Sequence, residues 1–344
     1  MSIRVLIVDD SPFAREVLRE VLRRHSDIEV IGEAGDGKRA ENLVCELQPD
    51  VVTMDVIMPM VGGLDAIRAI MARRPTPIVV VADVDSDYHG LSLQALEAGA
   101  LATYAKPKGG FTQEATDRLV GLLREAALVK VAHTSSSHPP LPGRTRVFPP
   151  RTRRIDIIGI VASTGGPQTL RRLLDGVAPG RFPPIAIVQH TSIGFTDAFT
   201  SWLGRVSELP VSVARHGQRL TAGTITVAPD DQHLEIHPGG VAHLHGAGRV
   251  GGHRPSGTLL LRSLAASYGG NAAGVVLTGM GDDGAEGARA MEQSGGTVYI
   301  EDPDLAILGG MPRSAMAHTQ NSIVASIEDI RRRLLYNESS RDGT

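Results

Sequence analysis

The amino-acid sequence predicts an α/β protein made of two doubly wound parallel-sheet domains. Three observations predict this class. The length of 344 residues suits two domains, because a domain typically takes roughly 150 residues. In both halves, short apolar runs alternate with segments of helical periodicity, which is typical of βαβ units. A segment rich in proline, serine and arginine separates the two halves.

The first domain is predicted over residues 1–128. Its first strand is the apolar run at 3–8, and Ser11 and Pro12 then begin a helix as cap and first helical residue. The remaining strands are predicted at 28–31, 51–54, 78–82 and 101–104, and the helices at 38–48, 64–73, 89–98 and 112–128. Strands and helices that alternate in this way predict one parallel sheet covered on both faces.

Residues 129–154 are predicted to be a linker, because prolines, serines and arginines leave almost nothing to bury there. The second domain is predicted over residues 155–336, and the polar residues 337–344 are expected to form a disordered tail. Its strands are predicted at 155–162, 184–189, 224–228, 273–278 and 297–300, and its helices at 167–175, 195–204, 257–268 and 284–294. A β-hairpin is expected at 232–245, with Pro238-Gly239-Gly240 as its turn.

Composition excludes several classes of protein. With 35 Lys and Arg against 38 Asp and Glu, the net charge of −3 excludes the broad basic field of a nucleic-acid-binding protein, so no DNA partner is expected. A single cysteine, Cys45, excludes a disulfide-stapled secreted domain. Apolar runs stay shorter than the about 18 residues of a membrane span, and the N-terminus lacks a signal-peptide pattern. We therefore expect a cytoplasmic protein without direct membrane insertion.

Charged residues follow three strands of the first domain. Asp9 and Asp10 come after the first strand, Asp55 after the third and Lys106 after the fifth. Because ligands gather at the carboxyl ends of parallel strands, these side chains are expected to converge. Clustered carboxylates suit Mg²⁺, and a carboxylate beside that ion can accept a phosphoryl group as an aspartyl phosphate. Lys106 would neutralise the phosphoryl oxygens.

The stretches around these residues resemble a response-regulator receiver domain, which has a flavodoxin-like fold. They are VDDS at 8–11, MDVIMPMVGGL at 54–64, ALEAGA at 95–100 and AKP at 105–107. The resemblance implies that Asp55 is the phosphoacceptor and that Lys106 forms the phosphoryl ion pair. It also implies that Asp9, Asp10, Asp55 and the backbone carbonyl of Ile57 hold Mg²⁺.

Two positions depart from the receiver pattern. Family members usually carry Thr or Ser directly after the fourth strand, where this sequence has Ala82 followed by Asp83. The aromatic residue usually found three positions before the lysine is replaced by Thr103, with Tyr104 beside it. We expect the phosphorylation chemistry to remain, because the metal and lysine residues are present. We hypothesise that Ala82 weakens the coupling of phosphorylation to activity.

Polar side chains also end three strands of the second domain. The strand at 155–162 delivers Ser163 into a Gly-rich turn and a helix, a setting that suits a nucleophile or a phosphate-binding turn. His190 follows the next strand, and Asp282 and Asp283 follow the strand at 273–278. Serine, histidine and aspartate on adjacent strand ends are the components of a hydrolytic triad.

Six stretches of the second domain resemble the chemotaxis protein-glutamate methylesterase family, whose catalytic domain is Rossmann-like. They are GIVASTGGP at 159–167, VQHTSIGFTDAF at 188–199, TVAPDDQHLEI at 226–236, RPSGTLLLRS at 254–263, GVVLTGMGDDGAEG at 274–287 and GGMPRSA at 309–315. The resemblance implies Ser163 as nucleophile, His190 as general base and Asp283 as the residue that orients His190. Asp283 is preferred to Asp282 because the family pattern is Gly-Met-Gly-any-Asp-Gly.

The resemblance further implies an oxyanion site made of backbone N–H groups of Thr164, Gly165 and Met280, and no cofactor for the esterase. The implied reaction is hydrolysis of glutamate γ-methyl esters on methyl-accepting chemoreceptors, together with deamidation of specific glutamines. A chemotaxis histidine kinase is the implied phosphodonor, and a monomer is expected. The alternative is a phospho-controlled binding module with an unused triad.

Histidines recur in the predicted hairpin, at 233, 237, 243 and 245. His243 and His245 share one face of a strand. A metal site is not favoured there, because we find no carboxylate or cysteine with matching spacing.

Overall fold

The computed structural model describes residues 2–58, 61–83, 88–129, 154–178, 182–191 and 194–335. The chain divides into two compact units between residues 152 and 153. Most of the predicted linker and the whole predicted tail at 337–344 lie outside the described residues, so the domain boundaries stay predictions. Within the described ranges, every helix is too short or too polar to cross a membrane.

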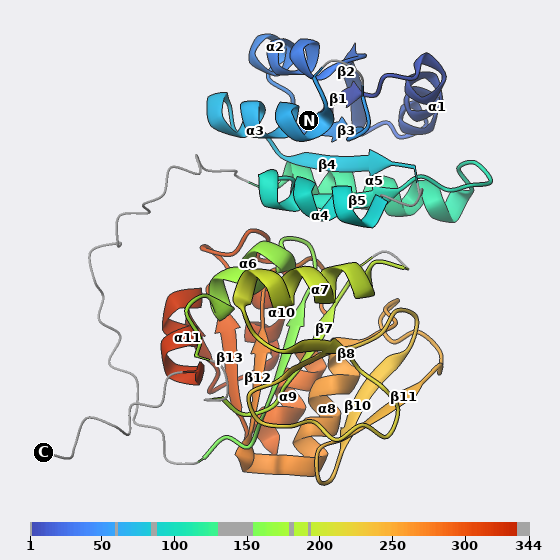
Figure 1. The fold of residues 1–344 in the computed structure, drawn as a ribbon. Helices are drawn as coiled ribbons and strands as arrows, with labels where there is room; N and C mark the ends of the chain where they lie inside the picture. Colours follow the sequence, from blue (N-terminus) through green and yellow to red (C-terminus); the bar gives the residue numbers. More distant parts are fainter. Residues whose placement is uncertain are drawn as a thin grey trace, which may run out of the picture. The chain divides into compact units, whose positions relative to one another are not determined.

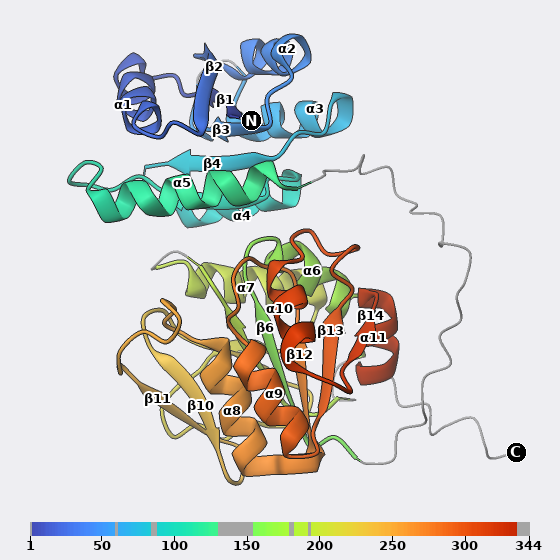
Figure 2. The same ribbon diagram turned by 180° about the vertical axis from the view of Figure 1, so that it is seen from behind.

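The first unit is a five-stranded parallel sheet in the order β2-β1-β3-β4-β5. Its strands are β1 (Ile3–Val8), β2 (Ile28–Ala34), β3 (Val51–Met54), β4 (Ile78–Ala82) and β5 (Ala102–Ala105). Its helices are α1 (Pro12–Arg23), α2 (Gly37–Leu47), α3 (Gly63–Arg73), α4 (Tyr88–Ala98) and α5 (Gln113–Ala127). Figures 1 and 2 show α4 and α5 on opposite faces of this sheet. The doubly wound prediction is confirmed.

Local sequence explains how the first unit begins. The Ser11 hydroxyl accepts a hydrogen bond from the backbone N–H of Ala14, and Pro12 is the first residue of α1, as predicted. The apolar run of β1 is buried on both faces of the sheet. On one of them Leu6 and Val8 pack with Ile67 of α3. Strand β2 continues to Ala34, three residues beyond the predicted end at 31.

The second unit is a seven-stranded parallel sheet in the order β14-β13-β12-β6-β7-β9-β8. Its strands are β6 (Ile157–Ala162), β7 (Ile185–Gln189), β8 (Val211–Val213), β9 (Ile225–Val227), β12 (Ala272–Val276), β13 (Thr297–Glu301) and β14 (Ile323–Ala325). Its helices are α6 (Gly166–Leu174), α7 (Thr196–Ser207), α8 (Gly257–Tyr268), α9 (Ala285–Gln293), α10 (Gly310–His318) and α11 (Ile327–Leu335), with a 3₁₀ turn, η1 (Gly269–Asn271). Helices α8, α9 and α10 lie in front of the sheet in Figure 2, and α6 and α7 lie behind it.

The prediction for this sheet was incomplete. Strands β8 and β14, at its two edges, and helices α10 and α11 had no predicted counterpart. Each of these strands has three residues, which is too short to show a hydrophobic period. The five predicted strands of the sheet are confirmed within two residues, and α8 has the predicted bounds.

The predicted hairpin is confirmed as the antiparallel pair β10 (His233–His237) and β11 (Val241–His245). Leu234, Ile236 and Ala242 are buried on its inner face, and β10 packs against α8. The hairpin therefore lies beside the main sheet and shares its core (Figures 1 and 2).

The core beneath α8 should be sensitive to truncation at Leu264. This side chain is fully buried among Val161, Leu261, Val276 and Met291. We expect Leu264→Ala to lower the free energy of unfolding of this unit by about 2–5 kcal/mol, because it removes apolar contacts and leaves a cavity. The measurement is urea unfolding of the full chain, followed by the fluorescence of its single, buried tryptophan. Leu305→Ala, at an exposed side chain, is the control, and equal midpoints for both variants would contradict the prediction.

Candidate active site

Ser163 and His190 follow two neighbouring strands at the centre of the second sheet. Strand β6 pairs with β7 on one side and with β12 on the other, and Ala162 of β6 is opposite Gln189 of β7. Ser163 and His190 are thus the first residues beyond paired strand ends. The chain leaves β6 toward one half of the sheet and later returns to build the other half, which makes this end a topological switch point. Ligands bind at such points in open α/β sheets.

A tight turn fixes Ser163 at the start of α6. The serine N–H donates to the carbonyl of Thr278, and the serine carbonyl accepts from the N–H of Gly166, at 3.0 and 2.8 Å. Gly165 has a φ of +80°, and a Cβ there would lie 2.8 Å from the Cβ of Ile307. The turn therefore requires glycine at 165 and leaves Ser163 half-buried at the mouth of the strand.

His190 forms the central contact of the site with Asp283. Its Nε2 lies 2.9 Å from Oδ2 of this buried aspartate. Asp283 also accepts hydrogen bonds from the Ser256 hydroxyl and from the N–H groups of Gly257, Thr258 and Gly284. Burial alone would raise the pKa of Asp283, but the hydrogen bonds and the charge of His190 outweigh it and hold the pKa well below its usual range. The carboxylate is therefore ionised at neutral pH, while its neighbour Asp282 is exposed.

The other ring nitrogen of His190 lies in a different environment. Nδ1 is buried and has no hydrogen-bond partner among the described residues. The side-chain amide of Gln189 donates to the carbonyls of both Ser163 and His190, at 2.8 and 2.9 Å. One buried side chain thus holds the backbone of both predicted catalytic residues.

Sequence reasoning missed His253, whose ring stacks on His190. The ring centroids are 4.0 Å apart, and the planes differ by 5°. Burial, together with the charge of His190, lowers the pKa of His253 to about 4, so the ring is neutral at neutral pH. A neutral ring in this place fixes the plane of His190. His253 directly precedes the matched stretch that starts at Arg254, which was the available signal.

The loop after β12 passes directly against the serine. A Cβ on Gly279 would lie 2.7 Å from the Cβ of Ser163. The N–H of Gly279 donates to the carbonyl of Leu308, and Met280 beyond it is exposed. Thr278 donates its hydroxyl hydrogen to the carbonyl of Thr164 at 2.9 Å. The loop therefore touches Ser163 at Gly279, and Met280 is the next residue of that loop.

Glu301, the last residue of β13, holds the backbone at Thr278 and was also missed. The N–H of Thr278 donates to its carboxyl group at 2.7 Å. Burial raises the pKa of Glu301 to about 7, because the charged form loses its hydration.

The acidic site of the first unit forms around Lys106. Its Nζ donates to Asp9 at 2.7 Å, to Asp55 at 2.9 Å and to the exposed Asp83 at 3.3 Å. Asp9 and Asp55 are buried, and Asp10 is exposed. Burial acts to lower the pKa of Lys106, but its carboxylate partners outweigh burial and raise this pKa. Burial raises the pKa of Asp55, and the bond from Lys106 offsets part of that rise.

The residues of this acidic site fit a hard divalent cation. Carboxylate oxygens of Asp9, Asp10 and Asp55 lie within 4.8 Å of one another, as an oxygen-ligated ion requires. The N–H of Ile57 donates to Asp55, which places the Ile57 backbone next to the carboxylate. The structure therefore brings together the side chains predicted for Mg²⁺ and phosphorylation.

The structure shows what surrounds the residues that depart from the receiver pattern. Ala82 is buried at the end of β4, and its carbonyl accepts from the N–H of Lys106. Tyr104 is also buried, with its hydroxyl donating to the carbonyl of Ala115 at 2.7 Å. Tyr104 is thus engaged inside the domain rather than standing in for an aromatic at Thr103.

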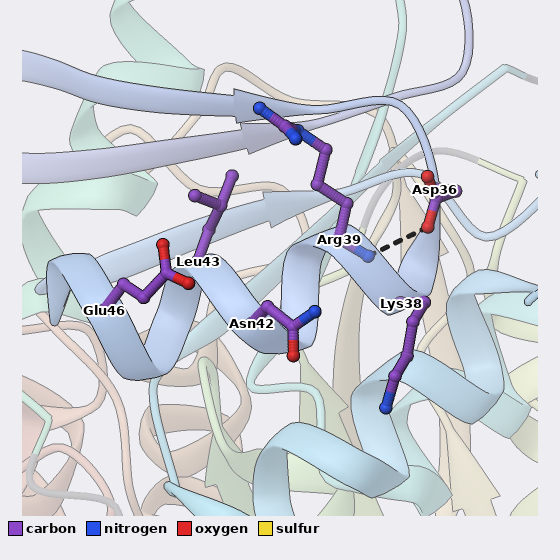
Figure 3. A pocket seen from close by; sticks show the side chains of 6 residues that line it. All are labelled: Asp36, Lys38, Arg39, Asn42, Leu43 and Glu46. Carbon is purple, nitrogen blue, oxygen red and sulfur yellow. Dashed lines mark hydrogen bonds between the residues drawn. The ribbon is translucent and has the colours of Figure 1, made fainter.

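A pocket of about 380 Å³ lies along α2 (Figure 3). It is lined by Asp36, Lys38, Arg39, Asn42, Leu43 and Glu46, and the Asp36 carboxylate accepts from the N–H of Arg39 as the helix cap. None of these residues belongs to either site above. The pocket is a gap between side chains of one helix, and we assign it no chemistry.

The depressed pKa of Asp283 predicts a pH dependence of stability. Its ionised form is favoured by folding, so its contribution is present above about pH 5 and is lost as pH falls toward 2. We expect Asp283→Asn to lower the free energy of unfolding at pH 7. The difference in this free energy between wild type and variant should shrink by about 2 kcal/mol as the pH falls from 5 to 2. The measurement is urea unfolding across that range, with Asp282→Asn as control. Parallel curves for wild type and Asp283→Asn would count against the assignment.

Comparisons with known proteins show which families the two units match. The family model described as CheB methylesterase matches residues 158–334, and that of the response regulator receiver domain matches residues 5–112. A protein-glutamate methylesterase/protein-glutamine glutaminase of Anaeromyxobacter dehalogenans is 42% identical over 92% of this chain and 93% of its own. A protein of the same description from Myxococcus xanthus is 40% identical over 96% of both chains.

A solved structure supports the fold of the second unit. The crystal structure of the Thermotoga maritima CheB methylesterase catalytic domain has a TM-score of 0.50 and 31% identity, and the match covers 53% of this chain and 98% of that one. The resemblance seen in the sequence motifs is thereby confirmed. The chain belongs to the CheB methylesterase family, and a response-regulator receiver domain precedes its methylesterase domain.

Proposed function

We propose that the second unit hydrolyses glutamate γ-methyl esters of chemoreceptors, with Ser163 as nucleophile, His190 as general base and Asp283 as its orienting partner. The chain is an enzyme of the methylesterase and glutaminase type, regulated through its receiver domain. The observation that carries the proposal is the bond between His190 and the ionised Asp283, which leaves the buried Nδ1 of His190 as the proton acceptor.

The reaction follows from this arrangement. Ser163 Oγ attacks the ester carbonyl while His190 Nδ1 takes the hydroxyl proton. Asp283 stabilises the imidazolium through Nε2–H, and methanol leaves with the proton that His190 returns. Water then attacks the acyl-enzyme while His190 again takes a proton. The bond between Ser163 Oγ and the acyl group breaks, His190 returns the proton to Oγ, and a glutamate side chain is released. A glutamine amide passes through the same acyl-enzyme with ammonia as the leaving group.

The oxyanion of the tetrahedral intermediate is assigned to backbone N–H groups of Thr164, Gly165 and Met280. Thr164 and Gly165 directly follow Ser163 in the turn, and Met280 follows Gly279, where a Cβ would lie 2.7 Å from the Cβ of Ser163. One such donor typically contributes about 3–4 kcal/mol to the transition state. No cofactor is assigned to the esterase reaction.

We assign the control of the esterase activity to phosphorylation of Asp55 by a chemotaxis histidine kinase. Asp9, Asp10, Asp55 and the Ile57 carbonyl would hold Mg²⁺, which neutralises charge on the phosphoryl oxygens when bound. Lys106 pairs with the same oxygens. We further propose that the protein is cytoplasmic and monomeric and that it meets its receptors without inserting into the membrane.

The nucleophile is tested with Ser163→Ala. Methanol release from methylated receptor membranes should fall by about 10³–10⁶-fold, since the acyl-enzyme cannot form. Ser201→Ala, at an exposed serine of α7, should retain the wild-type rate. If Ser163→Ala releases methanol normally, the serine mechanism is wrong. If the wild type releases none, the binding-module alternative is the better account.

The effect of Ala82 is tested by restoring a hydroxyl there. We expect Ala82→Ser to increase the activity gained from a small-molecule phosphodonor by up to about tenfold, because a hydroxyl can hydrogen-bond the charged phosphoryl group. The measurement is methanol release with and without phosphodonor. Asp55→Asn in both backgrounds is the control and should abolish the gain. An unchanged gain in Ala82→Ser would refute the hypothesis.

A further inference from the structure

The outer face of the β10–β11 hairpin gathers imidazole rings around one carboxylate. Glu235 of β10 is directly opposite His243 of β11. His237 lies two residues further along β10, and His245 lies two residues further along β11. Because alternate residues of a strand point to the same face, these four side chains project together, opposite the buried inner face.

The candidate ligand atoms lie close to coordination spacing. Glu235 Oε2 is 3.7 Å from His237 Nε2, 4.0 Å from His243 Nδ1 and 3.8 Å from His245 Nε2. One ligand atom from each of Glu235, His237 and His243 lies within 4.8 Å of the other two. Ligand atoms of a tetrahedral zinc ion lie about 3.3 Å apart, given bonds of about 2.0–2.1 Å. Side-chain rotation alone can therefore bring these atoms onto one ion.

A second observation points to a ligand at this place. His243 Nδ1 is buried and has no hydrogen-bond partner within the described part of the chain. It faces the Glu235 carboxylate from too far away for a hydrogen bond. Buried polar atoms are normally satisfied, and an ion between the carboxylate and this nitrogen would satisfy it.

Neighbouring rings pack against the histidines of this cluster but supply no competing ligand. His237 and His243 stack with centroids 4.6 Å apart and planes 10° apart, so one ring must rotate to aim both lone pairs at one ion. His216 packs on His243 from the neighbouring loop, but its Nδ1 is held by the backbone of Leu244. His216 thus forms a wall of the site rather than a ligand.

We propose that Glu235, His237 and His243 bind one divalent transition-metal ion of the Zn²⁺ type, with His245 next to the fourth position. Imidazole and carboxylate together suit zinc, whereas Mg²⁺ and Ca²⁺ prefer oxygen ligands alone. Glu235, which the strand register sets opposite His243, was not considered from the sequence. The bound ion would join the two strands of the hairpin.

The test uses the full chain prepared without a histidine tag and stripped with a chelator. Zn²⁺ is titrated by calorimetry and Co²⁺ by visible absorption, in excess Mg²⁺ so that the carboxylate site around Asp55 does not compete. We expect one equivalent of either ion and a tetrahedral Co²⁺ spectrum. Glu235→Gln and the double variant His237→Gln/His243→Gln should each lose at least about tenfold in affinity.

His318→Gln is the matched control, since His318 lies 3.6 Å from the Glu286 carboxylate elsewhere on the domain and that carboxylate is also paired with Arg262 and Arg289. It should bind like the wild type. Circular dichroism verifies that the variants are folded. The proposal is overturned if the wild type shows no saturable binding. It is equally overturned if the double variant still binds one equivalent of metal and His190→Gln binds none. That result would place the ion at the His190–His253 stack.

Discussion

The methylesterase domain depends on one buried charge, the carboxylate of Asp283. It accepts hydrogen bonds from the first residues of α8, where the helix dipole also favours a negative charge. The same carboxylate holds His190 beyond β7. Loss of this charge would leave several buried donors without an acceptor. The contact that orients the proposed catalytic base thus also joins the loop after β12 to α8.

The receiver domain shows the same principle with the charges reversed. Here the half-buried cation Lys106 lies between Asp9 and Asp55, which directly follow β1 and β3. Those two strands are adjacent at the switch point of the order β2-β1-β3-β4-β5. In each domain the topology of a parallel sheet thus brings charged residues from distant parts of the chain to one edge. The residue types differ between the two edges, and so does the chemistry that each edge supports.

Much of this was predictable because central strands are continuous apolar runs, and the residue after each run must lie at the sheet edge. Ser163, His190 and Asp55 could be placed in that way. Contacts between elements could not be predicted, because periodicity describes only one element at a time. The Ser256 hydroxyl, for example, donates to Asp283, which lies 27 residues away in the sequence. His253 lies in a loop without a period, and Glu235 gained its meaning only from the strand register opposite His243.

The orientation of His190 explains why the two central strands must be neighbours. In the proposed mechanism Nε2 is bound to Asp283, so the proton of Ser163 would pass to Nδ1, the ring nitrogen nearer the histidine backbone. Nδ1 has little reach, so the serine has to lie close to the main chain at 190. Pairing of β6 with β7 provides this closeness, and Gln189 secures it by donating to both carbonyls. Strand adjacency, rather than the length of a side chain, therefore sets the distance over which the proposed proton transfer takes place.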